Sequence, residues 1–270
     1  MKIGIISDLH VDGKDLPENM TLEDIVLERV QHVGVDTLIV AGDISNDMHR
    51  SLAALNMLRD QAEIPVLFVP GNHDYWSKTN GITNTWDIYK AYQSFAGCLC
   101  ERPYSINEEW VVIGNSGWYD YSMGEPSYSL EQFEKMHAMD RTWQDRLYVH
   151  WDRSNIEMHQ FFYDCLEHDL QQHQGKNIIL VTHMLSHPFF KVPVPNPQWE
   201  YFNAFLGSTA YMELCRKYQV RYSIMGHVHY RKQHEEEGTT YICACLGNHN
   251  EWRTSDAKAE VDLAMQVIEV

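Results

Sequence analysis

The sequence lacks any apolar run that approaches the roughly 20 residues needed to cross a bilayer. It also lacks the layout of a signal peptide, because Met1-Lys2 is followed at once by the strand-like residues 3–6. Cleavage after such a segment would remove Asp8, a candidate ligand. We therefore expect a cytoplasmic protein that acts without a membrane.

Basic residues are scarce. The chain of 270 residues has 21 Lys and Arg against 38 Asp and Glu, a formal net charge of −17. Such a surface repels polyanions, which disfavours nucleic acid as a partner. It does not exclude a small anionic substrate, because a metal site carries its own local positive charge.

The six cysteines form no C-x-x-C zinc pattern, and the chain is too long to need a disulfide scaffold. We expect reduced thiols in or near the core. The 44% hydrophobic and 22% charged content is that of an ordinary globular protein.

Strand and helix patterns alternate in the first third of the chain. We predict strands at 2–7, 37–41 and 65–69, with helices at 21–33 and 48–60. Thr21 and Asp24 mark the start of the first helix. This βαβαβ order predicts a parallel sheet with right-handed crossovers.

Further strands and helices follow after a break in the pattern. We predict strands at 110–114, 177–181 and 221–225, helices at 155–172 and 208–218, and antiparallel strands at 230–236, 239–245 and 264–269. The four prolines between 188 and 197 predict an irregular loop. Together these elements favour an α/β fold with two stacked sheets and helices outside, in a single domain 1–270 with an aromatic-rich insertion or cap at about 117–175.

Polar residues follow five of the predicted strands, and their types are those that bind metals. They are Asp8 and His10, Asp43, Asn72 with His73 and Asp74, His183, and His227 with His229. Because ligands bind at the carboxyl ends of strands in open α/β sheets, we expect these side chains to converge. Gly42, Gly71 and Gly226 each precede one of them, and a residue without Cβ lets the backbone pass close to a cluster.

The donor set fits two metal ions better than one. Four imidazoles, two carboxylates and one amide exceed what one tetrahedral site uses, and the absence of thiolate favours Mn, Fe, Zn, Co or Ni. Two divalent ions with two aspartates and a hydroxide leave about one unit of positive charge, which attracts a phosphate ester.

The series D-x-H, G-D, G-N-H-D, H and G-H-x-H, which runs from residue 8 to residue 229, resembles the signature of the calcineurin-like metallophosphoesterase superfamily. The resemblance implies a four-layer α/β/β/α sandwich with two stacked mixed sheets and a dinuclear centre, for which we favour manganese. The second motif lacks the longer G-D-x-x-D-R-G form, which weakens a protein-phosphatase interpretation.

The resemblance also implies a role for each residue. The first metal ion is assigned Asp8, His10, Asp43 and His229, with Asp43 bridging to a second ion held by Asn72, His183 and His227. His73 is expected to act as proton donor or charge stabiliser rather than as a ligand. Asp74 is expected to contribute to catalysis by orienting a neighbour.

The predicted reaction is hydrolysis of a small phosphodiester or pyrophosphate, by in-line attack of a metal-bridging hydroxide on phosphorus. A phosphomonoesterase and a non-catalytic metal-binding scaffold of the same fold are the alternatives. The aromatics of 117–175 are expected either to stack on substrate or to pack among themselves, and His187 either to contact substrate or to lie on the surface. The sequence leaves the oligomeric state open.

Overall fold

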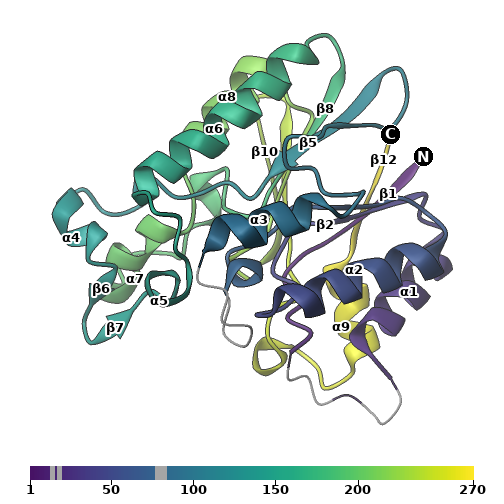
Figure 1. Cartoon of the computed structure of the whole chain (residues 1–270), viewed down its shortest axis with the longest axis horizontal. Helices are drawn as coiled ribbons and strands as arrows, with labels where there is room; N and C mark the ends of the chain where they lie inside the picture. The colour runs from purple at the N-terminus through teal and green to yellow at the C-terminus, as the bar shows by residue number, and fades with distance from the viewer. Residues whose placement is uncertain (13–15, 17–19, 77–83) are drawn as a thin grey trace.

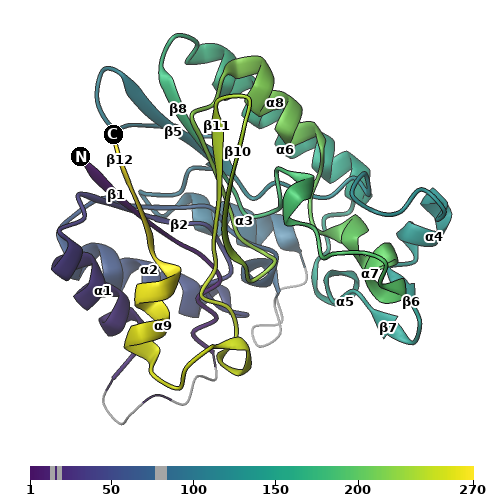
Figure 2. The same ribbon diagram turned by 180° about the vertical axis from the view of Figure 1, so that it is seen from behind.

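Two mixed β-sheets stack face to face at the centre of the molecule (Figures 1 and 2). The computed structural model covers the whole chain and describes residues 1–12, 16, 20–76 and 84–270. The first sheet has the order β12-β1-β2-β3, with bounds Gln266–Glu269, Lys2–Ile6, Thr37–Val40 and Val66–Phe68. Strands β1, β2 and β3 are parallel, as predicted, and β12 runs antiparallel to β1.

The second sheet has the order β10-β11-β9-β8-β5-β4, with bounds Arg231–Glu236, Thr239–Ala244, Tyr222–Met225, Asn177–Thr182, Trp110–Asn115 and Tyr104–Ser105. The predicted antiparallel pairing holds for the β10–β11 hairpin and for β12. It is wrong for the other side of β11, which pairs parallel with β9. The reason is that β10 takes the sheet edge, so the hairpin returns β11 alongside β9.

The core between the sheets comes from alternate residues of both. Ile3 and Ile5 of β1 meet Val112, Ile179 and similar side chains of the second sheet, all fully buried. The opposite faces are covered by helices. On the first sheet lie α1 (Leu22–Val33), α2 (Met48–Ala62) and α9 (Ala257–Ala264), with α3 (Thr85–Gln93) beside α2; on the second lie α6 (Asn155–Gln172) and α8 (Ala210–Tyr218). The predicted four-layer sandwich is therefore confirmed.

Local signals account for where several helices begin. Thr21 and Asp24, which were expected to mark the start of α1, form a capping box there, with Asp24 N–H donating to Thr21 Oγ1 at 3.2 Å. The sequence analysis did not predict α3 and α9, although Asn84 and Asp256 cap their first turns. The two helices have nine and eight residues, so each shows its helical period over only two to three turns.

A group of short elements projects from one end of the sandwich (Figures 1 and 2). It contains α4 (Leu130–Glu134), β6 (His137–Ala138), β7 (Arg141–Thr142), α5 (Asp145–Tyr148) and α7 (Pro197–Phe202), followed by the 3-10 turn Asn203–Phe205. Within the proline-rich segment, Pro188–Phe190 forms one 3-10 turn. The segment after β5 and the segment after β8, far apart in sequence, pack against each other here.

Most aromatics of this projection pack among themselves. Tyr121 stacks on Phe133 at 5.6 Å between ring centroids, and Phe205 meets both Tyr121 and Tyr201. Trp118 and Tyr119 are fully buried. Of the two expectations for these rings, mutual packing therefore describes the majority.

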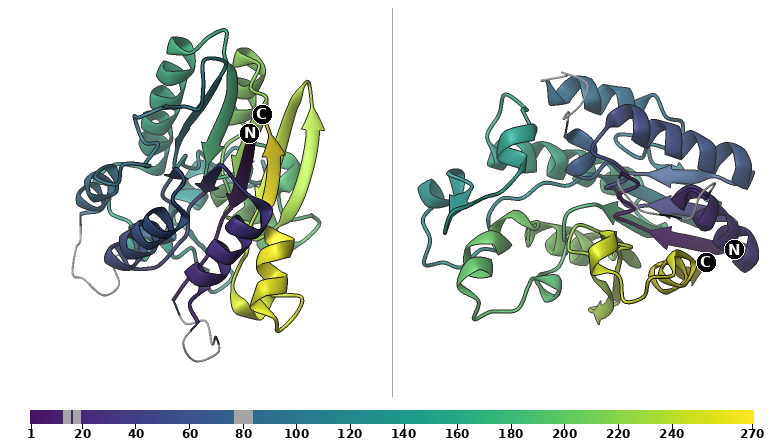
Figure 3. Two further views of the ribbon diagram at one scale, coloured as in Figure 1. Left: turned by 90° about the vertical axis from the view of Figure 1, so that its right-hand side faces the viewer. Right: turned by 90° about the horizontal axis from the view of Figure 1, so that it is seen from below.

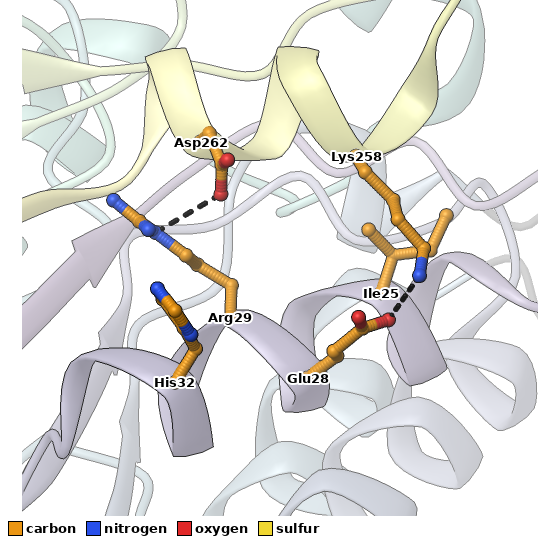
Figure 4. A pocket seen from close by; sticks show the side chains of 6 residues that line it. All are labelled: Ile25, Glu28, Arg29, His32, Lys258 and Asp262. Atoms are coloured by element: carbon orange, nitrogen blue, oxygen red, sulfur yellow. Dashed lines mark ion pairs between the residues drawn. The ribbon is translucent and has the colours of Figure 1, made fainter.

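The chain termini lie side by side at the far end of the sheets (Figure 3), where the Met1 amino group donates to the Val270 carbonyl at 2.7 Å. A groove of about 230 Å³ separates α1 from α9 (Figure 4). Two ion pairs span it, Arg29 to Asp262 at 3.1 Å and Lys258 to Glu28 at 2.5 Å. Its charges are thus paired with each other. Among the described residues, no helix combines the length and apolarity needed to cross a membrane.

All six cysteines are free, and five of them are buried. Cys243 and Cys245 lie on the same face of the second sheet, with their Sγ atoms 3.5 Å apart. The expectation of reduced thiols in or near the core agrees with these free and mostly buried cysteines.

Candidate metal centre

The seven candidate metal ligands converge where β1, β2, β3, β8 and β9 end. Three groups at this edge have donor atoms within 4.8 Å of one another, and one of them also includes His73: Asp8, His10 and His229; His10, Asp43 and His73; and Asp43, His183 and His227. Asp43 belongs to two groups, which places its carboxylate between the others. The parallel arrangement of the five strands is what brings residues up to 221 positions apart to one edge, from Asp8 to His229.

The first group lies around Asp8. Its Oδ1 is 3.4 Å from His229 Nε2, and His229 Nε2 is 3.1 Å from His10 Nε2. The second group lies around His183, whose Nε2 is 3.2 Å from Asp43 Oδ2 and 3.2 Å from Asn72 Oδ1. Asp43, Asn72 and His183 are buried, and His227 is half-buried.

The outward-facing atoms of these side chains are already bonded, and this tests whether they fit metal ions. His183 Nδ1 lies 2.8 Å from the Ala41 carbonyl, His227 Nε2 lies 3.2 Å from the Phe205 carbonyl, and His229 Nδ1 lies 2.5 Å from Glu251. Asn72 Nδ2 donates to Asp145 at 2.9 Å. Each contact leaves one lone-pair atom facing the cluster, as metal-ligating histidines and amides require. The residues present therefore fit divalent metal ions.

The electrostatics of the cluster also favour cations. Burial opposes protonation of His183, yet Asp43, Asp8 and the Ala41 carbonyl outweigh it and raise its pKa to about 9. Burial likewise opposes protonation of His229, but Asp8 and Glu251 raise its pKa to about 10. His227, buried beside His183, has its pKa lowered to about 4. The negative charge of the buried carboxylates therefore favours positive charge beside it, which protonated His183 and His229 provide when no metal is bound.

Five candidate ligands adopt a left-handed backbone. The φ angles are 55° at Asp8, 43° at His10, 55° at Asp43, 73° at His227 and 54° at His229. Such residues cost about 1 kcal/mol or more each and gather at functional sites. Backbone hydrogen bonds hold them, among them His10 N–H to the Asp43 carbonyl at 3.0 Å and His227 N–H to Asp8 Oδ1 at 3.1 Å.

All three predicted close backbone approaches are confirmed, and a Cβ added to Gly42 would lie 2.5 Å from His183 Nδ1. A Cβ added to Gly71 would lie 2.1 Å from Asp43 Oδ1, and one added to Gly226 would lie 2.1 Å from Ser7 Oγ and 2.6 Å from Asp8 Oδ2. Separations this short are incompatible with any side chain. Glycine at positions 71 and 226 lets the backbone lie directly against the two aspartates.

His73 lies at the edge of the cluster, a quarter exposed. Its Nε2 is 4.0 Å from Asp43 Oδ2, its Nδ1 is 2.7 Å from Asn46 Oδ1, and its ring packs on Trp76 with centroids 3.6 Å apart. Burial lowers the pKa of His73 well below its ordinary value, against the opposing effect of Asp43. The ring is therefore held in one orientation and favours the neutral form.

Asp74 lies beneath the cluster, fully buried. Its carboxylate accepts hydrogen bonds from the backbone N–H groups of Asp43 at 2.8 Å, Gly71 at 2.9 Å, Ile44 at 3.1 Å and Ser45 at 3.3 Å, and from Ser51 Oγ at 2.7 Å. Burial and Asp43 raise its pKa to about 7. Five donors and no acceptor favour the carboxylate form, which holds the loops after β2 and β3 together.

Two acidic residues of the site were missed by the sequence analysis. Asp145, in the projection, accepts from Asn72, and Glu251 contacts His229. Glu251 stands two residues after His249, which is exposed. Neither acid follows a predicted strand, so no sequence signal marked it.

Two hollows open onto the cluster. One, of about 200 Å³, is lined by Asp43, Asn72, His73, Trp76, Arg141, Thr142, Trp143, Gln144, His227 and His229. The other, of about 380 Å³, is lined by Trp143, Val192, Trp199, Leu206, His227, Val228, His229, Tyr230 and Glu251. Trp143, His227 and His229 line both, so the two hollows meet at the centre.

His187 lines neither hollow and is 4% exposed, so it is not a surface histidine. Its Nε2 is 3.0 Å from Glu236 Oε2, and His234 Nε2 is 3.3 Å from the same oxygen. Its Nδ1 accepts the Phe189 N–H at 3.1 Å, so the neutral ring carries its proton on Nε2. Nε2 is the atom with which His187 would bind a metal, and the proton occupies it. His187, His234 and Glu236 therefore form a hydrogen-bonded group.

Comparison with known proteins agrees with this geometry. The sequence profile of the calcineurin-like phosphoesterases matches residues 1–231, and the chain belongs to that family. Over 74 residues it is 31% identical to a probable cyclic nucleotide phosphodiesterase of Vesicomyosocius okutanii subsp. Calyptogena okutanii (strain HA); the match spans 26% of this chain and 31% of that relative.

Solved structures share the fold. A phosphopantetheinyl hydrolase from Mycobacterium tuberculosis superimposes with a TM-score of 0.74 at 21% identity, over 93% of this chain and 91% of that one. A dimetal phosphatase from Danio rerio gives a TM-score of 0.54 at 16% identity, over 90% and 86% of the two chains. The family is one of phosphoester hydrolases that use divalent metals.

Proposed function

We propose that this protein is a dinuclear phosphodiesterase that hydrolyses a small phosphodiester or pyrophosphate. Asp8, His10, Asp43 and His229 would hold one ion, and Asn72, His183 and His227 the other, with Asp43 shared. When bound, the two ions supply Lewis acidity for the phosphoryl oxygens and lower the pKa of a water. Manganese is the favoured metal, and the cytoplasm the favoured compartment.

The observation that carries the preference for a diester is the pair of hollows that meet at the centre. A diester has two arms on phosphorus, and each hollow accommodates one. A monoester would need only one hollow. Arg141 and Gln144 give the first a polar wall, whereas Val192, Trp199 and Leu206 give the second an apolar wall.

The chain's own residues orient the substrate and stabilise charge. Trp76 packs on the His73 ring, and Asn46 fixes its Nδ1, so that Nε2 faces the site. From there His73 would stabilise the charge that develops on the leaving oxygen, or give it a proton. Because its pKa is lowered, hydrogen bonding by a neutral ring is the favoured mode.

The test compares bis-p-nitrophenyl phosphate with p-nitrophenyl phosphate, using metal-stripped protein reloaded with Mn²⁺. We expect faster turnover of the diester, abolished in Asp43→Ala and His183→Ala and retained in His49→Ala, which changes an exposed histidine of α2. Preference for the monoester would support a phosphomonoesterase. Two bound metals without turnover of either compound would support the scaffold alternative.

The natural substrate is the next step. A cyclic nucleotide is a phosphodiester, and so is a phosphopantetheinyl group joined to a hydroxyl. Both similar proteins therefore bear names that belong to the proposed class. We propose to assay a cyclic nucleotide and a phosphopantetheinyl diester once the generic diester is cleaved. Hydrolysis of only one of them would identify which two groups on phosphorus the hollows accept.

A further inference from the structure

Asp145 is a carboxylate in a place that disfavours charge. It begins α5 in the projecting group and is 2% exposed. Among the described residues, no lysine or arginine nitrogen lies within 4.0 Å of its oxygens. Burying an unpaired carboxylate costs several kcal/mol in general. Such a residue is retained where its hydrogen bonds serve a purpose.

Four donors surround this carboxylate. Asn72 Nδ2 at 2.9 Å and Trp76 Nε1 at 2.7 Å donate to Oδ1, and Trp143 Nε1 at 2.8 Å and Tyr119 Oη at 3.3 Å donate to Oδ2. A carboxylate is an acceptor only, so ionised Asp145 satisfies all four. An asparagine in its place would turn an NH₂ group toward one pair of donors, whichever way its amide points.

Three of the donors reach different parts of the candidate site. Asn72 is a proposed ligand, Trp76 packs on His73, and Trp143 lies 5.7 Å from His227 between ring centroids. Asp145 thus connects the projection to the second metal position through its hydrogen bond with Asn72. It connects the projection to the edge of the site through its hydrogen bonds with Trp76 and Trp143. Other contacts of Trp76 supplement its bond.

We infer that Asp145 is the positioning residue of the second metal position: it fixes the Asn72 amide with Oδ1 toward His183 and orients the two tryptophans at the rim. The Asp145 bond prevents the Asn72 amide from turning its NH₂ group toward the cluster. A charged acceptor also strengthens the hydrogen bond from Nδ2 and increases the negative charge on Oδ1, as second-layer carboxylates do at metal sites. The inference rests on the proposed ligation by Asn72.

The experiment titrates metal-free protein with Mn²⁺ and follows both binding events by calorimetry and electron paramagnetic resonance. In Asp145→Asn we expect one affinity to fall about 10- to 100-fold and the other, at Asp8, His10 and His229, to stay unchanged. Near-UV circular dichroism of the metal-free variant should change, because one of the two indoles, that of Trp76 or that of Trp143, loses its acceptor. Asp140→Asn, an exposed aspartate of the same projection, serves as the control with unchanged affinities.

A second variant keeps the inference testable if Asp145→Asn folds poorly. Trp143→Phe removes one donor and leaves the Asp145–Asn72 bond in place, so both metal affinities should match the wild type, while KM for the diester rises. If Trp143→Phe weakens metal binding, or if Asp145→Asn weakens both sites equally, Asp145 merely supports the projection and the inference is overturned. Wild-type protein that binds fewer than two Mn²⁺ would instead refute the proposed dinuclear centre.

Discussion

Asp74→Asn should destabilise the metal-free protein strongly. Asp74 Oδ2 accepts the backbone N–H groups of Asp43 and Gly71, and Oδ1 accepts those of Ile44 and Ser45 together with the Ser51 hydroxyl. An asparagine must place its NH₂ group on one of the two sides. The less damaging choice leaves two buried backbone N–H groups without an acceptor, those of Asp43 and Gly71.

Each buried donor without an acceptor costs about 1–3 kcal/mol, so the expected loss is about 2–6 kcal/mol in the free energy of unfolding. A domain is stable by only about 5–15 kcal/mol, so the loss is a large fraction of the total. Urea unfolding of the chelator-treated variant and wild type measures it. Ser51→Ala, which removes one donor and leaves four, is the control, with a loss of about 1 kcal/mol.

The reasoning on Asp74 has a clear opposite outcome. If metal-free Asp74→Asn is as stable as wild type but its metal-loaded form loses turnover, the carboxylate acts directly in the reaction rather than through the loops. Equal stability would also show that the five hydrogen bonds contribute little to folding. Only equal stability together with lost turnover would move Asp74 from a positioning role to a catalytic one.

Four further predictions concern the centre itself. His73→Ala should reduce turnover about 10²- to 10⁴-fold while metal content by mass spectrometry stays near wild type; equal loss of metal would make His73 a ligand. Glu251→Gln should weaken one Mn²⁺ site about 10- to 100-fold in a binding titration, because the variant removes the negative charge next to His229 Nδ1. An unchanged titration would show that the contact is incidental. Adding Mn²⁺ at 100 times Kd should stabilise wild type by about 2.7 kcal/mol per occupied site in thermal unfolding, and chelator should reverse it; no shift would contradict a metal site. In metal-free protein, the raised pKa values of His183 and His229 stabilise the fold fully below about pH 6.5, and this contribution is lost as the pH rises through about 9 to 10, which urea unfolding across that range would detect.

Much of the fold was predictable because its signals are local. Buried strands read as apolar runs, and their order with the intervening helices dictates a parallel sheet. The antiparallel expectation for β11 failed because strand neighbours are set by which edge the hairpin occupies, and no local signal carries that. Helices α3 and α9 escaped notice because each is only two to three turns long.

The candidate ligands were predictable for a different reason. A strand that ends in Asp8, Asp43, His183 or His227 places that side chain at a common edge, so chain order alone implies proximity. The sequence by itself thus determined the layers, the strand ends and the donor types that gather there. Only the tertiary structure decided the left-handed backbone at five of the ligands, the outward bonds that expose one lone pair on each, and the carboxylates of Asp145 and Glu251 behind Asn72 and His229. Those features depend on contacts between segments more than 20 residues apart, which hydrophobic period and local propensity do not encode.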